Sequence, residues 1–368
     1  MLERFKVPEK DRVYVRPEQV RAATEAIFQK MGLEDAGARQ CADVLITNDL
    51  RGVETHGVSN MLRQYVKRYG DGSQNPRPKV RTVRETSTTA TLDGDNGLGI
   101  HVGPDAMRLA ISKAKQHGMG AVTMFNSGHL GGCGYHAVLA TEYDMIGLCM
   151  TGGGGASMVP TWAAEPRFGT NPVAWAAPAR NQPPFLFDVA STQIANNKIG
   201  LARRLGVKLE AGWIARQDGT PVLEEVPVPD KYYMLPFGGT REMGSHKGYG
   251  SAAVVDIMCC TLSGIGPGFI SKKGGHFFCA FRIDAFTDPE KFKDDMDAFL
   301  EGLAKTKPAP GHERVLYPGL SEGEETAKRN REGIPYHREV VDWFKSIGAE
   351  LGIPVELTQG TGPGPRGR

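Results

Sequence analysis

The sequence is poor in cysteine and has no excess of charge of either sign. Only six cysteines occur in 368 residues, and none of them forms a C-x-x-C pair. This spacing suggests neither a disulfide framework nor a cysteine-rich zinc site, and free buried thiols in a reducing cytoplasm are expected. Lysine and arginine total 44 against 42 acidic residues, which gives a net charge of +2. Without a basic surface, neither nucleic acid nor an anionic membrane is expected as a partner.

Long hydrophobic segments are also missing. The N-terminal stretch MLERFKVPEKDRVYV carries charges where a signal peptide would carry an apolar core. The longest uncharged run, 145–164, contains four consecutive glycines and a proline. We therefore predict a cytoplasmic protein without a membrane-spanning segment.

Glycine, by contrast, is abundant. The chain contains 47 glycines, roughly twice the usual share of about 7%. They follow no fixed period and occur in separate clusters among apolar segments, which excludes a collagen-like chain. A chain of this length usually forms one large or two medium domains, and we start from two.

Helical and strand-like patterns alternate along the chain. Apolar residues recur at helical spacing over 17–69, where the segment RGVETHG interrupts them, and a polar connector follows at 70–79. Short Val- and Thr-rich runs then alternate with a helical pattern at 103–118, and helical patterns return after residue 248. This order predicts an α/β unit inserted into a mainly helical part. The predicted division is a helical domain of residues 1–80 plus 250–355, an α/β domain at 81–249 and a flexible tail at 356–368.

The break at 51–57 carries a histidine and an arginine. His56 lies between two glycines, and Arg51 precedes it by five residues. Histidine titrates near neutral pH, and arginine grips a carboxylate with two parallel hydrogen bonds, so the pair suits proton transfer beside a carboxylate anchor. A structural histidine at a helix cap explains the same residues equally well.

A glycine-rich loop after a strand, FNSGHLGGCGYH, carries a second candidate, His129. In α/β sheets, ligands bind outside the carboxyl ends of strands, where small residues let them approach the backbone. A metal site of His129, Cys133 and His136 is the alternative interpretation, and it would make the protein a metal-dependent hydrolase or lyase. No carboxylate lies near these residues and no common zinc spacing matches, so no metal is expected.

Three further segments have features of ligand contacts. TGGGG at 151–155 follows a strand and exposes successive backbone N–H groups that suit an anion. Asp188 ends the apolar run FLFDVA, where a carboxylate either caps a turn or binds ligand hydroxyls. Lys247 stands at the start of an apolar helix, against the preference of the helix dipole, which indicates a partner such as a phosphate. By contrast, GLGIHVG at 97–103 lacks the spacing of a dinucleotide fingerprint, which disfavours a Rossmann domain and indicates a turn before a helix.

Five segments in this order resemble the malate/L-lactate dehydrogenase family of non-Rossmann NAD(P)-dependent oxidoreductases: RGVETHGVSNMLRQY, NSGHLGGCGY, GTNPVAWAAP, FDVASTQIANNKI and GSHKGYGSA. The resemblance spans about residues 15–350. It implies a mixed-sheet, non-Rossmann cofactor domain inserted into a mainly helical domain. It also implies a homodimer and a small carboxylate substrate bound between the two parts.

The resemblance also implies roles for individual residues. His129 and His56 would handle the proton, with His129 the first choice because it follows a strand of the expected cofactor domain. Thr170 and Asn171 would contact the substrate. The expected cofactor contacts are Thr151, Gly153, Asp188, Val189, Ala190, His246, Lys247, Pro318, Gly319 and Leu320.

The helix after the first histidine departs from the family pattern. Members usually carry Arg four residues after that histidine and Tyr four residues further on, whereas this chain has Asn60 and Gln64 there. Arg63 and Tyr65 lie nearby instead. The anchor of the substrate carboxylate is therefore expected at Arg63 or Arg51, with Asn60 and Tyr65 also in the substrate site, unless the substrate is atypical.

These observations predict an NAD(P)-dependent dehydrogenase of the EC 1.1.1 type. It would move a hydride between the nicotinamide and C2 of a small 2-hydroxy or 2-oxo acid of the malate, lactate or sulfolactate kind. Of the two cofactors, NAD is favoured over NADP. Reduction of a cyclic imine or ketimine carboxylate is the alternative within the family, and metal-dependent hydrolysis or lysis is the alternative outside it.

Overall fold

A seven-stranded mixed sheet forms the centre of the molecule in the computed structural model, which describes residues 5–358, 360 and 362. The strand order is β2-β3-β4-β10-β5-β6-β7. β3 and β4 pair in parallel, and every other neighbouring pair in this sheet is antiparallel. The strands are β2 (Arg81–Glu85), β3 (Thr89–Gly97), β4 (Met119–Ser127), β5 (Met145–Gly153), β6 (Val173–Ala177), β7 (Phe185–Val189) and β10 (Gly274–Arg282).

Helices cover the two faces of this sheet. On one face, α4 (Gly99–His117) and α5 (Cys133–Val138) bury apolar side chains against residues such as Phe278 of β10. On the other face, α7 (Ser245–Asp256) and the π-helical turn that continues it (Ile257–Thr261) pack against the neighbouring Phe277. Adjacent residues of β10 thus enter different cores, because side chains of a strand alternate between the faces of its sheet.

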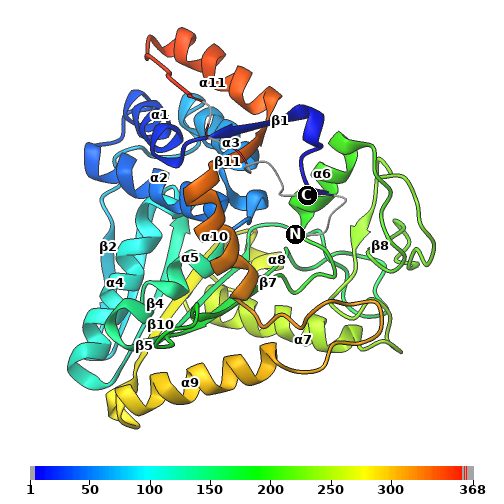
Figure 1. Ribbon diagram of the computed structural model, residues 1–368. Helices are drawn as coiled ribbons and strands as arrows, with labels where there is room; N and C mark the ends of the chain where they lie inside the picture. Colours follow the sequence, from blue (N-terminus) through cyan, green and yellow to red (C-terminus); the bar gives the residue numbers. More distant parts are fainter. Residues whose placement is uncertain (1–4, 359, 361, 363–368) are drawn as a thin grey trace.

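A helical part lies next to the sheet and has its own core. Figure 1 shows α1, α2, α3 and α11 gathered at the top of the view, with α7 and α9 at the bottom. A short antiparallel pair joins the two ends of this part, because Val13 of β1 lies opposite Tyr336 of β11. The elements are β1 (Arg12–Val15), α1 (Pro17–Lys30), α2 (Asp35–Leu50), α3 (Val58–Gly70), α10 (Leu320–Glu332), β11 (Ile334–His337) and α11 (Arg338–Leu351).

A third, smaller core forms around residues such as Met158 and Leu209. The elements of this region and of the connections to the sheet are α6 (Asn196–Leu205), β8 (Ile214–Ala215), β9 (Tyr233–Met234), α8 (Gly268–Ser271) and α9 (Pro289–Ala304).

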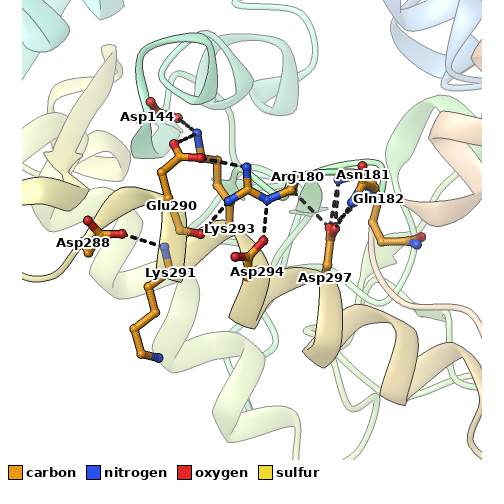
Figure 2. A network of polar contacts seen from close by, with 10 residues as sticks. All are labelled: Asp144, Arg180, Asn181, Gln182, Asp288, Glu290, Lys291, Lys293, Asp294 and Asp297. Atoms are coloured by element: carbon orange, nitrogen blue, oxygen red, sulfur yellow. Dashed lines mark hydrogen bonds and ion pairs between the residues drawn. The ribbon is translucent and has the colours of Figure 1, made fainter.

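Helix α9 fixes the loop between β6 and β7 through a cluster of charges (Figure 2). The Asp297 carboxylate accepts the backbone N–H groups of Arg180 at 3.0 Å, Asn181 at 3.0 Å and Gln182 at 3.1 Å. The Arg180 guanidinium reaches back to Glu290 at 2.7 Å and to Asp294. These contacts hold the hairpin whose second strand carries Asp188.

The predicted α/β fold with a mixed sheet is confirmed, but two of its boundaries need correction. β10 lies between β4 and β5, so the segment 250–355 does not belong wholly to the helical part. Its run GGHFFCAFR was overlooked among the helical patterns. Helix α4 begins at Gly99, five residues before Pro104, so the 97–103 segment is mostly helix instead of a turn before one.

The tail predicted at 356–368 is described only in part, because residues 359, 361 and 363–368 lie outside the described residues. All six cysteines are free and buried. None of the helices among the described residues combines the length and the apolar content that crossing a membrane requires.

Candidate functional site

Two histidines from distant segments stack on each other. His56 belongs to a 3-10 turn between α2 and α3, and His129 follows β4 in the glycine-rich loop. Their ring centroids are 5.7 Å apart with an interplanar angle of 2°. The fold thus brings together the two residues that the sequence predicted as proton-transfer candidates.

His129 is held through one ring nitrogen. The Gly131 N–H donates to its Nδ1 at 3.2 Å, and the Tyr65 hydroxyl lies 2.7 Å from the same atom. Because a backbone N–H only donates, Nδ1 is the acceptor, so the neutral ring carries its proton on Nε2 and Tyr65 donates as well. Tyr65, predicted as a substrate contact, therefore orients the His129 ring.

Glycines allow the His129 loop to lie against helix α4. A Cβ added at Gly99 would lie 2.5 Å from the Gly128 carbonyl oxygen and 2.7 Å from that of His129. Gly131 has a φ of +76°, a conformation that costs other residues free energy. The glycine cluster of this loop is thus required for close packing of the backbone around His129.

The His56 loop is held by buried charges instead. The Arg329 guanidinium donates to the Asp49 carbonyl at 2.7 Å and pairs with the Glu54 carboxylate at 2.7 Å. The Asp49 carboxylate accepts the Val58 N–H at 2.9 Å and the Tyr336 hydroxyl at 2.6 Å. Residues of α10 and β11 therefore fix both ends of the loop that contains His56, and we call Asp49, Glu54, Arg329 and Tyr336 the charged clamp.

Burial keeps both site histidines neutral. It lowers the pKa of His56 to about 4, with a smaller contribution from the charge of Lys198. It lowers the pKa of His129 to about 3, with smaller contributions from His56 and Arg68. An anion bound beside the rings would raise both pKa values, because an opposite charge stabilises the imidazolium.

A third histidine lies behind the His129 loop. His276 of β10 places Nδ1 2.7 Å from the Thr151 hydroxyl and Nε2 3.2 Å from the Gly128 carbonyl oxygen. Since the carbonyl only accepts, Nε2 donates to it and Nδ1 accepts from Thr151. Thr151, predicted as a cofactor contact, is thus tied to the loop of His129. Sequence reasoning overlooked His276, because it stands in the strand that was itself missed.

Asp188 approaches the same loop from β7. Its carboxylate accepts the Gly134 N–H at 2.7 Å. Packing around the carboxyl raises its pKa to about 6, although part of the residue is exposed, and the charge of Arg51 opposes this rise. Arg51 therefore lies among acidic groups, and Val189 and Ala190 follow Asp188 at the end of the strand.

The predicted contacts at 318–320 lie against the start of β7. The Leu186 N–H donates to the Pro318 carbonyl at 3.0 Å, and Leu320 begins α10. Gly319 has a φ of +105°, and a Cβ there would lie 2.4 Å from the Pro184 carbonyl oxygen. This segment thus links the hairpin of Asp188 to the helix that carries Arg329.

Backbone and amide groups gather around the glycine loop 152–155, where Gly169 lies close to the Asn171 side chain and to the Gly153 and Gly155 carbonyls. Asn171, which has a φ of +38°, is buried, and its Oδ1 has no hydrogen-bond partner among the described residues. The Ser191 N–H donates to the Thr170 carbonyl at 2.8 Å. Gly153 has a φ of +73°. His246 and Lys247 stand exposed in the first turn of α7, and among the described residues no hydrogen bond or ion pair joins them to His56 or His129.

Two predicted substrate contacts point elsewhere. Arg63 pairs with Glu339 at 2.8 Å, and its guanidinium lies 5.2 Å from the ring centroid of Trp343, both on α11. The Asn60 side chain donates to the Glu54 carbonyl at 2.6 Å. Arg63 is thus already engaged away from the two histidines, and Asn60 supports the loop of His56.

The metal interpretation of the glycine-rich loop finds no support. His136 is buried and its Nε2 lies 2.9 Å from the Leu130 carbonyl oxygen, while the thiol of Cys133 contacts that of Cys149. Among the described residues, no group of three or more His, Cys, Asp or Glu side chains is arranged to hold a metal ion.

Helix α6 contributes two residues that sequence reasoning missed. The Asn197 side chain donates to the Thr55 carbonyl at 2.6 Å, next to His56. Lys198 is half-buried and its charge acts on His56. Both stand in the segment STQIANNKI that carried the resemblance, but nothing in the sequence shows that α6 meets a loop about 140 residues earlier.

The chain matches the family model described as malate/L-lactate dehydrogenase over residues 15–345. It is 36% identical to the malate dehydrogenase of Pyrococcus horikoshii, covering 92% of this chain and 98% of that protein. It is 34% identical to the L-sulfolactate dehydrogenase of Methanocaldococcus jannaschii, covering 93% and 98%. The crystal structure of malate dehydrogenase from Entamoeba histolytica is similar with a TM-score of 0.88 and 32% identity, covering 93% of this chain and 99% of that chain.

Proposed function

Because the chain belongs to the malate/L-lactate dehydrogenase family and is therefore a dehydrogenase of 2-hydroxy acids, we propose that His129 transfers the hydroxyl proton of its substrate. The stacked pair of His56 and His129 carries this proposal. A nicotinamide cofactor, when bound, supplies or removes the hydride at C2. The tasks left to the chain are to hold the acid and to handle one proton.

The tautomer of His129 fits proton exchange with the substrate oxygen. With two donors on Nδ1, the neutral ring is fixed in orientation and presents an Nε2–H group to a ligand. A substrate carboxylate beside the ring raises its pKa, so the ring takes up a second proton on Nδ1, where the Tyr65 oxygen then accepts a hydrogen bond. In the direction of reduction, this imidazolium gives its Nε2 proton to the 2-oxo group. In the direction of oxidation, the ring that is protonated on Nδ1 takes the hydroxyl proton on Nε2.

The residues around the glycine loop fit an anionic ligand that carries hydroxyl groups. The exposed Lys247 suits a phosphate. Asp188 would accept hydroxyl hydrogen bonds and repel an added phosphate, which favours NAD over NADP. We propose Thr151, Gly153 and the 188–190 and 318–320 segments as the remaining contacts of the cofactor.

A substrate screen with both cofactors tests the proposed function. Malate, sulfolactate, lactate and their 2-oxo acids are offered with NAD and NADP in parallel, with a cyclic imine carboxylate added to the reduction panel. We expect absorbance changes of the reduced nicotinamide with at least one 2-hydroxy acid, larger with NAD, and unchanged by a chelator. No change with any pair would contradict the proposal.

We also propose that the chain forms a homodimer through the sheet face that α7 covers only in part. On this face, Trp175 and Phe187 lie opposite each other on β6 and β7 and are 38% and 36% exposed. Val254 and Ile257 of the covering helix and its π-turn are 52% and 55% exposed. Apolar surface of this kind indicates a protein contact.

Sedimentation at micromolar concentration tests the dimer. We expect a species of twice the 39.9 kDa chain mass, and a monomer for the double variant Val254→Asp, Ile257→Asp. The control is Leu223→Asp, which changes a more exposed apolar residue (64%) outside this face. A wild-type monomer would overturn the proposal.

A further inference from the structure

Lys198 is a cation without an anion at the edge of the histidine pair. It occupies the first turn of α6, where a positive charge opposes the helix dipole. Its side chain is half-buried, and within the part of the chain that the structure describes its ammonium has no hydrogen bond or ion pair. Burial is the only cause that lowers its pKa. The free protein thus bears the cost of partly dehydrating this charge without compensation.

The contacts of the neighbouring residue fix Lys198 beside His56. The Asn197 amide donates to the Thr55 carbonyl at 2.6 Å and lies 3.5 Å from the Met61 sulfur. Thr55 precedes His56, and its hydroxyl lies 3.0 Å from the His56 Nδ1. The first turn of α6 therefore packs on the loop of His56, and the ammonium of Lys198 is the cation that acts on that histidine.

The two arginines that the sequence offered as carboxylate anchors both have acidic groups near them. Arg63 is paired with Glu339 and stacked on Trp343. Arg51 lies among acidic groups, of which Asp188 has the largest effect on its charge. Arg68, whose charge reaches His129, also acts on the carboxylate of Asp71. Among the described residues, Lys198 is the cation near the two histidines whose charge no neighbouring acid offsets.

We propose that Lys198 anchors the carboxylate of the 2-hydroxy or 2-oxo acid and so sets the preference of the site for acids. This inference rests on the proposed function, because it assigns a residue to the same site. A carboxylate held by the ammonium would lie beside the imidazoles, where it offsets both the unpaired charge and the low proton affinity of the rings. One residue would thus bind the acid and prepare the histidines for proton transfer.

Binding of an unreactive 2-oxo acid analogue tests this role directly. Oxamate is titrated into the protein with bound NADH, and the fluorescence of NADH reports binding. We expect Lys198→Met to weaken oxamate binding and raise KM for the 2-oxo acid by roughly 10²-fold, the usual loss when one member of a desolvated charge pair is removed. Lys198→Arg should keep most of the affinity. The control Lys305→Met removes an equal charge from the exposed residue that follows α9 and should change neither quantity.

The pKa of His56 gives a second readout, which tests that the charge of Lys198 lies beside the histidine pair. In the free protein, loss of the Lys198 charge should raise the pKa of His56, which NMR titration of the ring proton follows. The proposal would be overturned if Lys198→Met bound oxamate within threefold of the wild-type affinity. It would also be overturned if Arg68→Met, and not Lys198→Met, lost oxamate affinity. Wild type without activity on any 2-hydroxy acid would refute the proposed function itself. NADH affinity and the unfolding midpoint of Lys198→Met show whether the variant is folded.

Discussion

The two site histidines come from regions that are stabilised in different ways. His56 depends on the charged clamp, in which Arg329 and Tyr336 reach across from α10 and β11. His129 depends on backbone packing, in which Gly99 admits the carbonyl groups of the loop. Ion pairs remain favourable after small displacements, but their strength depends on pH and on both partners being present. Close backbone contacts do not depend on pH, but any added atom would clash there. The same site thus has one support that is electrostatic and one that is steric.

Substitution of each site histidine by asparagine gives the largest expected effect on kcat. His129→Asn should lower kcat for hydroxy acid oxidation by about 10² to 10⁴, the usual contribution of a proton-transfer residue. His56→Asn should lower it by about tenfold, because that ring supports its partner by stacking. Steady-state kinetics of both variants measures the difference. The opposite order would assign proton transfer to His56 and the clamp region.

Addition of one methyl group should break the steric support. Gly99→Ala forces atoms into the 2.5 Å approach to the Gly128 carbonyl, so the loop must shift. Because a displacement of about 1 Å in a reacting group costs up to 10²-fold, we expect kcat to fall by 10 to 10². The control Gly302→Ala adds the same methyl on α9, where nothing lies within 4 Å, and should leave kcat unchanged. Equal kcat for both variants would show that the loop is pliable.

Loss of the central cation should break the electrostatic support. Arg329→Met leaves Glu54 buried without its partner, so we expect unfolding to become easier by about 3 kcal/mol and kcat to fall by about tenfold. The matched control is Arg314→Met, which removes an exposed ion pair with Glu324, a residue of the helix that carries Arg329. It should lower the unfolding free energy by at most about 1 kcal/mol. Denaturant unfolding and kcat at one pH compare the two. A clamp variant as active as its control would contradict the comparison.

The pH dependence of stability gives the smallest expected effect on activity. Burial raises the pKa of Asp49 from 3.8 to about 7 in the folded chain, although Tyr336 and the Val58 N–H oppose the rise. Folding therefore favours the protonated acid, so its contribution is complete below about pH 4 and is lost as pH rises through 7. Wild type should lose roughly 2 to 4 kcal/mol of unfolding free energy over this pH interval, and Asp49→Asn should not show this loss. Unfolding free energies of wild type and variant at pH 4.5 and 7.5 test this, and parallel slopes would contradict it.

The sequence was sufficient for features carried by local patterns. Apolar spacing predicted the helices around Val20 and Leu45, and the glycine-flanked His56 and His129 were recognised before their meeting in space could be seen. Partners far along the chain were not predictable. Tyr65 bonds a histidine 64 residues away, and Arg63 pairs with an acid 276 residues away. No local pattern distinguishes an arginine that faces a ligand from one that faces another helix.

The missed strand β10 shows the same limit for the fold. Its residues alternate between two cores, so both faces are apolar, and a short apolar run does not reveal whether it is strand or helix. Its position between β4 and β5 depends on pairing with strands more than a hundred residues earlier. His276 and the boundary at 249/250 were lost with it.

The clamp also bears on how the chain is made. Arg329 and Tyr336 follow their contact at Asp49 by 280 and 287 residues. Domains fold as the chain leaves the ribosome, N-terminal segments first. The loop of His56 is synthesised early, and it lacks its contacts with Arg329 and Tyr336 until most of the remaining chain has been translated. The support of the His56 loop is therefore completed late in synthesis, and a chain released before residue 329 would carry both histidines but lack the clamp.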